Sequence, residues 1–109
     1  MASERREVLD FGSIVIDHDR GQLSVDGSAR YLTPMERDLL WALAQQPGEV
    51  VDSDDLLQEV WGYPPGLNTR TLDVHIGRLR RKLGENGRNP RHILTVRSVG
   101  YRFDPSPDT

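Results

Sequence analysis

The sequence predicts an α+β domain in which a small antiparallel β-meander precedes three helices and a C-terminal β-hairpin. From Asp10 to Leu32, short runs with alternating apolar residues are separated by turn residues. From Thr33 onward, the apolar residues recur with helical spacing. After Gly84, a polar loop leads to two short runs typical of strands. With 109 residues, the chain is long enough for one compact domain with one modest core.

The meander is expected to contain three strands. Asp26 and Gly27 form a pair typical of a two-residue hairpin turn, and residues 18–21 form an earlier turn. The expected strands are 13–17, 22–25 and 29–32. We expect residues 10–104 to form the domain, with flexible tails at 1–9 and 105–109.

The helices are delimited by capping and breaking residues. Thr33, Pro34 and Glu36 match a capping box with proline at the first helical position, and Pro47–Gly48 ends this first helix. Trp41 falls within its apolar pattern and is expected in the core. The second helix is expected from Asp52 or Ser53 to about Trp61–Gly62, the third over Asn68–Leu83, and the final strands at His92–Val96 and Tyr101–Phe103. Three helices followed by a β-hairpin describe a winged helix.

The third helix is expected to have two chemically distinct faces. At about 100° per residue, one apolar stripe is expected to be buried. This stripe contains Leu72, Ile76, Leu79 and Leu83. The opposite face contains Arg70, Val74, Gly77, Arg78 and Arg81, while Arg80 and Lys82 lie on the flanks. Gly77 either allows close backbone approach to a ligand or is simply tolerated.

The net charge of −3 conceals a strong asymmetry. Residues 70–102 contain nine cationic and two acidic side chains, and therefore carry +7, whereas the rest of the chain carries −10. A local positive field attracts polyanions whatever the global charge. A solvated cationic surface is the simpler interpretation. However, the outer face of the third helix has no acid, and its N-terminal residues lie where an inserted helix reaches base edges.

Two further residues favour DNA as the polyanion. Val74 lies in the middle of the cationic face, where it would pack on a thymine methyl group in a major groove. Arg97 lies at the expected hairpin tip, where it is either solvated or inserted into a minor groove.

Several motifs resemble the C-terminal output domain of OmpR/PhoB-type response regulators. The resemblance rests on VWGYPPGLNTRTLDVHIGRLRRKL followed by ILTVRSVGYRF, and on LTPMERDLLWALAQQPGEVVDSDDLLQEVWG for the first two helices. It covers residues 11–103 and includes the N-terminal sheet that distinguishes this family from other winged helices.

The resemblance implies a cytoplasmic regulator that binds double-stranded DNA and controls transcription without a cofactor. In the family, a receiver domain phosphorylated through a sensor kinase precedes this module, and dimers bind tandem direct repeats head to tail. The implied DNA-binding residues are Arg70, Thr71, Val74, Arg78, Arg80, Arg81, Thr95, Arg97 and Tyr101. Among them, Arg80 would grip the DNA backbone, and Thr95 and Tyr101 would lie near phosphates. The implied contact loop for RNA polymerase contains Trp61, Gly62, Tyr63, Pro64, Pro65, Gly66, Leu67 and Asn68.

The sequence departs from the family pattern at three places. Gly77 stands where many members carry arginine, and Ser98 stands where glycine is common after the wing arginine. The paired Pro64 and Pro65 make the polymerase loop stiffer than usual, so repression is an alternative to activation.

Other classes of function have less support. A winged helix that binds proteins instead of DNA is the main alternative, with Val74 and Trp61 as candidate contacts. RNA binding would require clustered surface aromatics, which the sequence lacks. Catalysis and metal binding are not expected, because His18, His75 and His92 are scattered without metal-ligand spacing and His75 is expected to be packed. The chain has no cysteine, no signal-peptide pattern and no apolar run long enough to span a bilayer.

Overall fold

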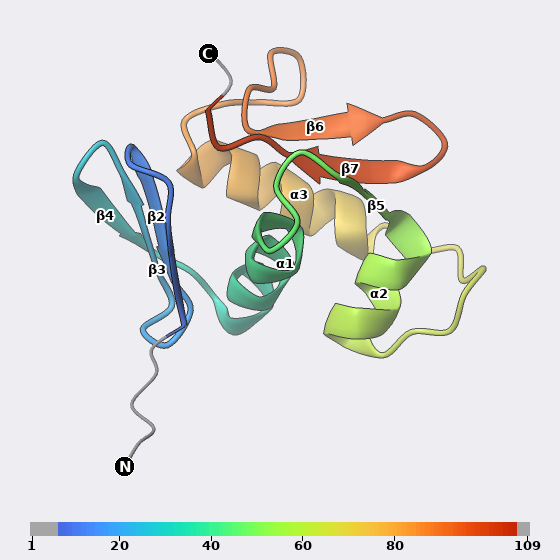
Figure 1. Cartoon of the computed structure of the whole chain (residues 1–109). Coiled ribbons are helices and arrows are strands. Elements are labelled where there is room, and N and C mark those ends of the chain that lie inside the picture. Colours follow the sequence, from blue (N-terminus) through green and yellow to red (C-terminus); the bar gives the residue numbers. More distant parts are fainter. Residues whose placement is uncertain (1–6, 107–109) are drawn as a thin grey trace.

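The computed structural model describes residues 7–106 as two small antiparallel sheets with three helices between and beside them (Figure 1). The elements are β1 (Val8–Asp10), β2 (Ile14–Asp17), β3 (Gln22–Val25), β4 (Ser28–Tyr31), α1 (Pro34–Ala44), β5 (Val50–Asp52), α2 (Ser53–Trp61), α3 (Thr71–Lys82), β6 (Ile93–Val96) and β7 (Gly100–Phe103). The three helices and the β6–β7 wing form a winged helix, which confirms the predicted fold class.

The N-terminal sheet has the strand order β1-β2-β3-β4. Asp26 and Gly27 connect β3 to β4 with φ angles of 51° and 83°, so the predicted two-residue turn is confirmed. β1 was not predicted, because three residues are too few to display an alternating pattern. The predicted N-terminal tail is therefore wrong for Val8 and Leu9, which pair with β2. Residues 1–6 and 107–109 of the predicted tails lie outside the described residues.

The predicted capping box of α1 is confirmed. Thr33 Oγ1 accepts a hydrogen bond from the Glu36 amide at 3.2 Å, and Glu36 Oε1 accepts one from the Thr33 amide at 3.0 Å. α2 ends at Trp61 and is capped by Gly62, whose φ of 75° is typical of a glycine C-cap. α3 begins at Thr71, three residues later than predicted. Its first amide is instead bonded to Thr69 Oγ1, 3.2 Å away.

The second sheet has the order β5-β7-β6 and joins the wing to the helices. β5 was not predicted, because its partner lies some fifty residues later in the chain, where Val51 pairs with Tyr101. The two strands come close together at Gly100. A Cβ atom at this position would lie 1.9 Å from the Val51 carbonyl oxygen, so only glycine fits.

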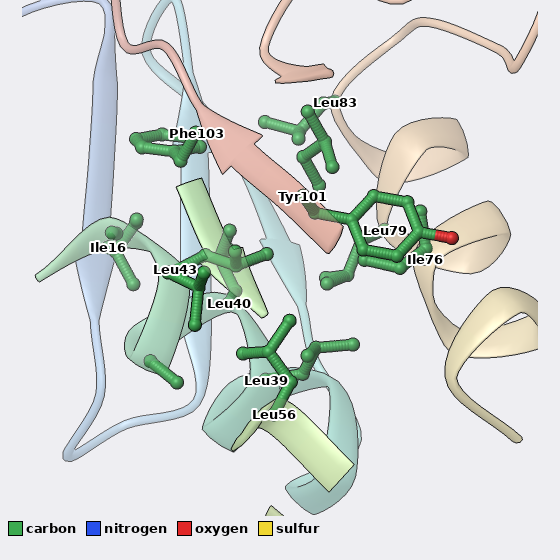
Figure 2. Close-up of a cluster of buried hydrophobic side chains, with 14 of the residues drawn as sticks. Ile16, Leu39, Leu40, Leu43, Leu56, Ile76, Leu79, Leu83, Tyr101 and Phe103 are labelled. Atoms are coloured by element: carbon green, nitrogen blue, oxygen red, sulfur yellow. The ribbon is translucent and has the colours of Figure 1, made fainter. Parts of the chain in front are cut away.

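The core surrounds α1, which packs against α2, α3 and β7. Figure 2 shows side chains of α1 between Ile16 of the N-terminal sheet and Ile76 and Leu79 of α3. Trp41 is half-buried and packs against this core, as predicted. Within residues 7–106, no helix combines the length and apolar composition needed to cross a bilayer.

Candidate nucleic-acid interface

The predicted segregation of α3 into two faces is confirmed. The four apolar residues of the stripe are each at most 4 % exposed: Leu72, Ile76, Leu79 and Leu83. On the opposite side, Val74 is 46 % exposed, and Arg70, Arg78 and Arg81 are exposed around it. Apart from its chain neighbours and the backbone of its own helix, Gly77 has no atom within 4 Å of where a Cβ would be on this face, so nothing among residues 7–106 requires glycine there.

The outer face of α3 carries positive charge that the domain itself does not neutralise. Within residues 7–106, neither the Arg78 nor the Arg81 guanidinium has a hydrogen-bond or ion-pair partner. The single acid of the helix, Asp73, accepts a 2.8 Å hydrogen bond from the Tyr101 hydroxyl of the wing. Its carboxylate is therefore engaged with the wing, and the arginine face remains available to an anionic ligand.

The structure places Arg80 against the wing, and its grip on a DNA backbone stays a prediction. The residue is only 8 % exposed, and its Nε and Nη2 both donate to the Ile93 carbonyl oxygen at 3.0 and 2.8 Å. Nη2 also donates to Thr95 Oγ1 at 2.9 Å, and the guanidinium carbon lies 5.8 Å from the centre of the Tyr101 ring. The helical pattern placed Arg80 on the flank of α3, but the wing covers that flank. Arg80 anchors β6 to α3.

Tyr101 is also held inside the domain, and its position near DNA phosphates stays a prediction. Tyr101 is 8 % exposed, and its only hydroxyl hydrogen is donated to Asp73. Burial, reinforced by this hydrogen bond and by the negative charge of Asp73, raises the pKa of Tyr101 to about 12. Thr95, in contrast, is exposed. Its oxygen accepts from Arg80, which leaves its own hydroxyl proton for another acceptor.

The wing tip presents Arg97 to solvent. The turn is closed by the Val99 amide, which donates to the Val96 carbonyl oxygen at 3.0 Å. Ser98 has a φ of 67°, in the left-handed region that glycine adopts without strain. The Val99 carbonyl in turn accepts from the Ser53 amide at 3.0 Å, so the start of α2 supports the tip.

Glu85 fastens the loop between α3 and the wing. This 9 % exposed carboxylate accepts from the backbone amides of His92 and Ile93 at 2.9 and 3.0 Å. It also contacts His92 Nδ1 at 2.9 Å. Glu85, Arg80 and Asp73 thus hold the wing to α3 at three points.

The segment between α2 and α3 is anchored at its base and exposed at its apex. Trp61 stacks with Tyr63 at 6.5 Å and meets His75 edge-on at 5.0 Å. His75 Nδ1 lies 2.9 Å from the Thr71 carbonyl oxygen, which confirms the predicted packed histidine. The apex is exposed and consists of Pro64, Pro65, Gly66, Leu67 and Asn68.

Sequence reasoning missed two residues beside this interface, Arg30 and Tyr31. They belong to β4 but line a groove of about 570 Å³ with the C-terminal turn of α3. No local pattern could have identified them, because Tyr31 and Lys82 lie 51 positions apart in the sequence.

The histidines lie in separate surroundings. The structure brings Glu7, His18 and Asp19 together, with one potential ligand atom from each within 4.8 Å of the others. His18 Nδ1 pairs with Glu7 and Nε2 with Asp38, both at 3.0 Å. Both ring nitrogens therefore already face carboxylates, and Asp19 accepts a hydrogen bond from the Glu7 amide at 2.9 Å, so contacts within the domain account for this group.

Comparisons with known proteins agree with this architecture. Residues 27–103 match the family described as "Transcriptional regulatory protein, C terminal". The chain is 43 % identical over 102 residues to the DNA-binding response regulator MtrA of Mycolicibacterium smegmatis. This match covers 94 % of the chain but only 45 % of MtrA, so the chain spans less than half of that relative.

Two solved structures have the same fold. The Klebsiella pneumoniae RstA DNA-binding domain, in complex with the RstA box, has a TM-score of 0.84 and 38 % identity, covering 91 % of this chain and 98 % of that one. The Thermotoga maritima response regulator DrrB, an OmpR/PhoB homologue, has a TM-score of 0.78 and 32 % identity, covering 93 % of this chain and 46 % of that one. The resemblance predicted from the sequence is confirmed: this chain belongs to the family of C-terminal domains of OmpR/PhoB-type transcriptional regulatory proteins.

Proposed function

We propose that this chain is the output domain of a two-component response regulator and binds double-stranded DNA sequence-specifically to control transcription. The observation that carries the proposal is the outer face of α3, where Arg70, Val74 and Arg78 are exposed and no acid within residues 7–106 forms an ion pair with the two arginines. The complex of RstA with its box supports the same use of the fold.

The proposal assigns DNA contacts to residues of α3 and to the wing tip. Arg70 and Thr71, at the N-terminus of α3, reach base edges in the major groove. Arg78 pairs with guanine or a nearby phosphate, and Val74 packs on a thymine methyl group. Arg97 at the wing tip enters the neighbouring minor groove, whose negative potential favours arginine.

Two other residues contact the DNA backbone. Thr95 donates its hydroxyl proton to a phosphate, because its oxygen already accepts from Arg80. Arg81 is exposed at the last turn of α3 and neutralises another phosphate.

We propose the other partners of the protein by analogy with its family. A receiver domain and its sensor kinase act upstream in the cytoplasm, and two copies bind tandem direct repeats head to tail. The loop from Trp61 to Asn68 meets RNA polymerase through its exposed apex. The paired prolines stiffen this loop, so the protein either activates or represses depending on whether the loop fits polymerase.

Selection of bound duplexes from a random pool tests the function directly. We expect an enriched half-site, repeated in the same orientation with centres about one helical turn apart. Binding to one selected duplex is then measured as the salt concentration is raised. A steep fall of log K with log salt supports phosphate contacts. A pool without enrichment, together with a shallow salt slope, would instead favour the protein-binding winged helix.

A further inference from the structure

The groove between β4 and the end of α3 is strongly cationic. It has a volume of about 570 Å³ and is lined by Arg30, Tyr31, Glu36, Arg78, Arg81 and Lys82. Four cationic side chains and one carboxylate leave the lining with a net charge of +3. A surface of this sign attracts a polyanion, and it adjoins the face of α3 already assigned to DNA.

The floor of the groove is internally neutralised. Glu36 is 2 % exposed, and its Oε1 accepts a 2.6 Å hydrogen bond from Lys82 Nζ. Lys82 also donates to the Tyr31 carbonyl oxygen at 2.8 Å, which ties the end of β4 to the last turn of α3. Lys82 therefore holds the groove together, and the charge available to a ligand comes from the three arginines.

Arg30 reaches the groove from the N-terminal sheet. It pairs across the strands with Leu23, so the two side chains share the sheet face that is turned toward the core. β4 is an edge strand, and Arg30 therefore lies at the rim of that face beside α3. Tyr31 follows it with 72 % of its surface exposed, which leaves its hydroxyl available as a hydrogen-bond donor.

We infer that this groove is a second DNA contact, in which Arg30, Tyr31 and Arg81 bind the sugar–phosphate backbone beside the major groove that α3 enters. The inference rests on the proposed function and extends the interface to the N-terminal sheet. Arginine and tyrosine side chains are both common donors to phosphate oxygens.

The length of α3 explains why the backbone lies there. Its 12 residues span about 18 Å, whereas the major groove is roughly 12 Å wide. When the N-terminal turn reaches base edges, the C-terminal turn emerges near the flanking strand. Arg81 and the β4 residues beside it then face phosphates, while Arg78 bridges the two contacts.

The salt dependence of binding to a mixed-sequence duplex tests this inference. We expect Arg30→Gln to weaken binding about three- to tenfold and to reduce the slope of log K against log salt by about 0.9, the value for one phosphate contact. Arg30→Lys keeps the charge and is expected to retain most of the slope. Tyr31→Phe is expected to weaken binding a few-fold without changing the slope, because it removes a neutral donor.

Arg102→Gln is the matched control. It removes the same charge from β7, but Arg102 neighbours Tyr101 in the strand and therefore points to the sheet face away from α3. Thermal unfolding of each variant verifies that the fold is intact, and Tyr31→Phe reports on the groove if Arg30→Gln is unstable.

The outcomes separate the two proposals. If binding of the unaltered domain to duplex DNA falls steeply with salt but Arg30→Gln behaves like Arg102→Gln, the groove is not a DNA contact, although the proposed function stands. If the unaltered domain shows no salt-dependent binding to duplex DNA, both proposals are rejected.

Discussion

The hydroxyl of Tyr101 on β7 donates a 2.8 Å hydrogen bond to the carboxylate of Asp73 on α3, 28 positions earlier in the chain. This contact connects the two elements that the proposed function places in adjacent DNA grooves. Arg80 reinforces it by donating from α3 to β6. The orientation of the wing relative to α3 is therefore set by polar contacts around a buried aromatic ring.

The raised pKa of Tyr101, caused first by burial and then by Asp73, predicts a loss of stability at alkaline pH. In the folded state the pKa of Tyr101 is about 12, above the ordinary value of 10. The contribution of the Tyr101 hydroxyl to the free energy of unfolding is therefore complete below pH 10 and is lost as the pH rises through 12. A pKa rise of this size corresponds to roughly 3 kcal/mol. Denaturant unfolding between pH 8 and about 12 measures the loss.

Two variants identify the source of this pH dependence. Tyr101→Phe is expected to be less stable by about 1–2 kcal/mol at neutral pH and to lose the alkaline dependence. Asp73→Asn is expected to lower the pKa of Tyr101, followed by the ultraviolet absorbance of tyrosinate. An unchanged titration in Asp73→Asn would mean that the carboxylate does not act on the hydroxyl.

The buried carboxylate of Glu36 predicts a second pH dependence, a loss of stability in acid. Burial alone would raise its pKa, but the hydrogen bonds from Lys82 and Thr33 outweigh burial and hold the pKa below its ordinary value of 4.5. The contribution of Glu36 is therefore complete above pH 4.5 and is lost as the pH falls through the lowered folded pKa. Glu36→Gln is expected to lower the free energy of unfolding by about 1–3 kcal/mol at neutral pH, because the charged hydrogen bond to Lys82 is lost. The loss is limited because solvent screens the partly exposed Lys82.

Urea unfolding of Glu36→Gln at neutral and acidic pH checks this prediction. The difference from the unaltered domain is expected to shrink in acid, where the carboxylate is protonated. A difference that stays constant with pH would show that packing, and not ionisation, causes the loss. Lys82→Met completes a double-mutant cycle for the pair.

Gly100 and Gly77 predict opposite responses to the same substitution. Gly100→Ala is expected to destabilise the domain by about 3 kcal/mol or more, because its Cβ would overlap the Val51 carbonyl oxygen. Gly77→Ala is the control, since its Cβ would meet nothing within 4 Å, and helix propensity predicts a gain of up to about 1 kcal/mol. Thermal unfolding of both variants measures the contrast. A DNA-binding loss in Gly77→Ala would favour close backbone approach over simple tolerance.

Leu79 and Arg78 are neighbours in sequence on opposite faces of α3. Leu79→Ala is expected to cost about 2–5 kcal/mol of stability, because the residue is 0 % exposed. Arg78→Ala is expected to leave stability nearly unchanged but to weaken binding to a selected duplex by about 1–3 kcal/mol if it contacts a base. Equal losses on all duplexes would instead identify Arg78 as a phosphate contact.

The sequence alone determined the features that depend on neighbours within a few residues. The capping box at Thr33 and the turn at Asp26–Gly27 are local, and the structure has both. The two faces of α3 follow from helical periodicity, which needs no knowledge of distant partners. Leu72 and Leu79 are buried, and Arg78 and Arg81 are exposed, for this reason.

Only the tertiary structure decided which polar groups meet across long separations. β5 forms because Val51 pairs with Tyr101 of β7. Arg80 holds β6 to α3 because the wing packs over the flank of α3. Arg30 and Tyr31 join the arginine face because Lys82 ties β4 to α3. Periodicity specifies which way a side chain points from its own helix or strand. The packing of the whole chain specifies what it meets there, because the free energy that orders such contacts comes from the shared core.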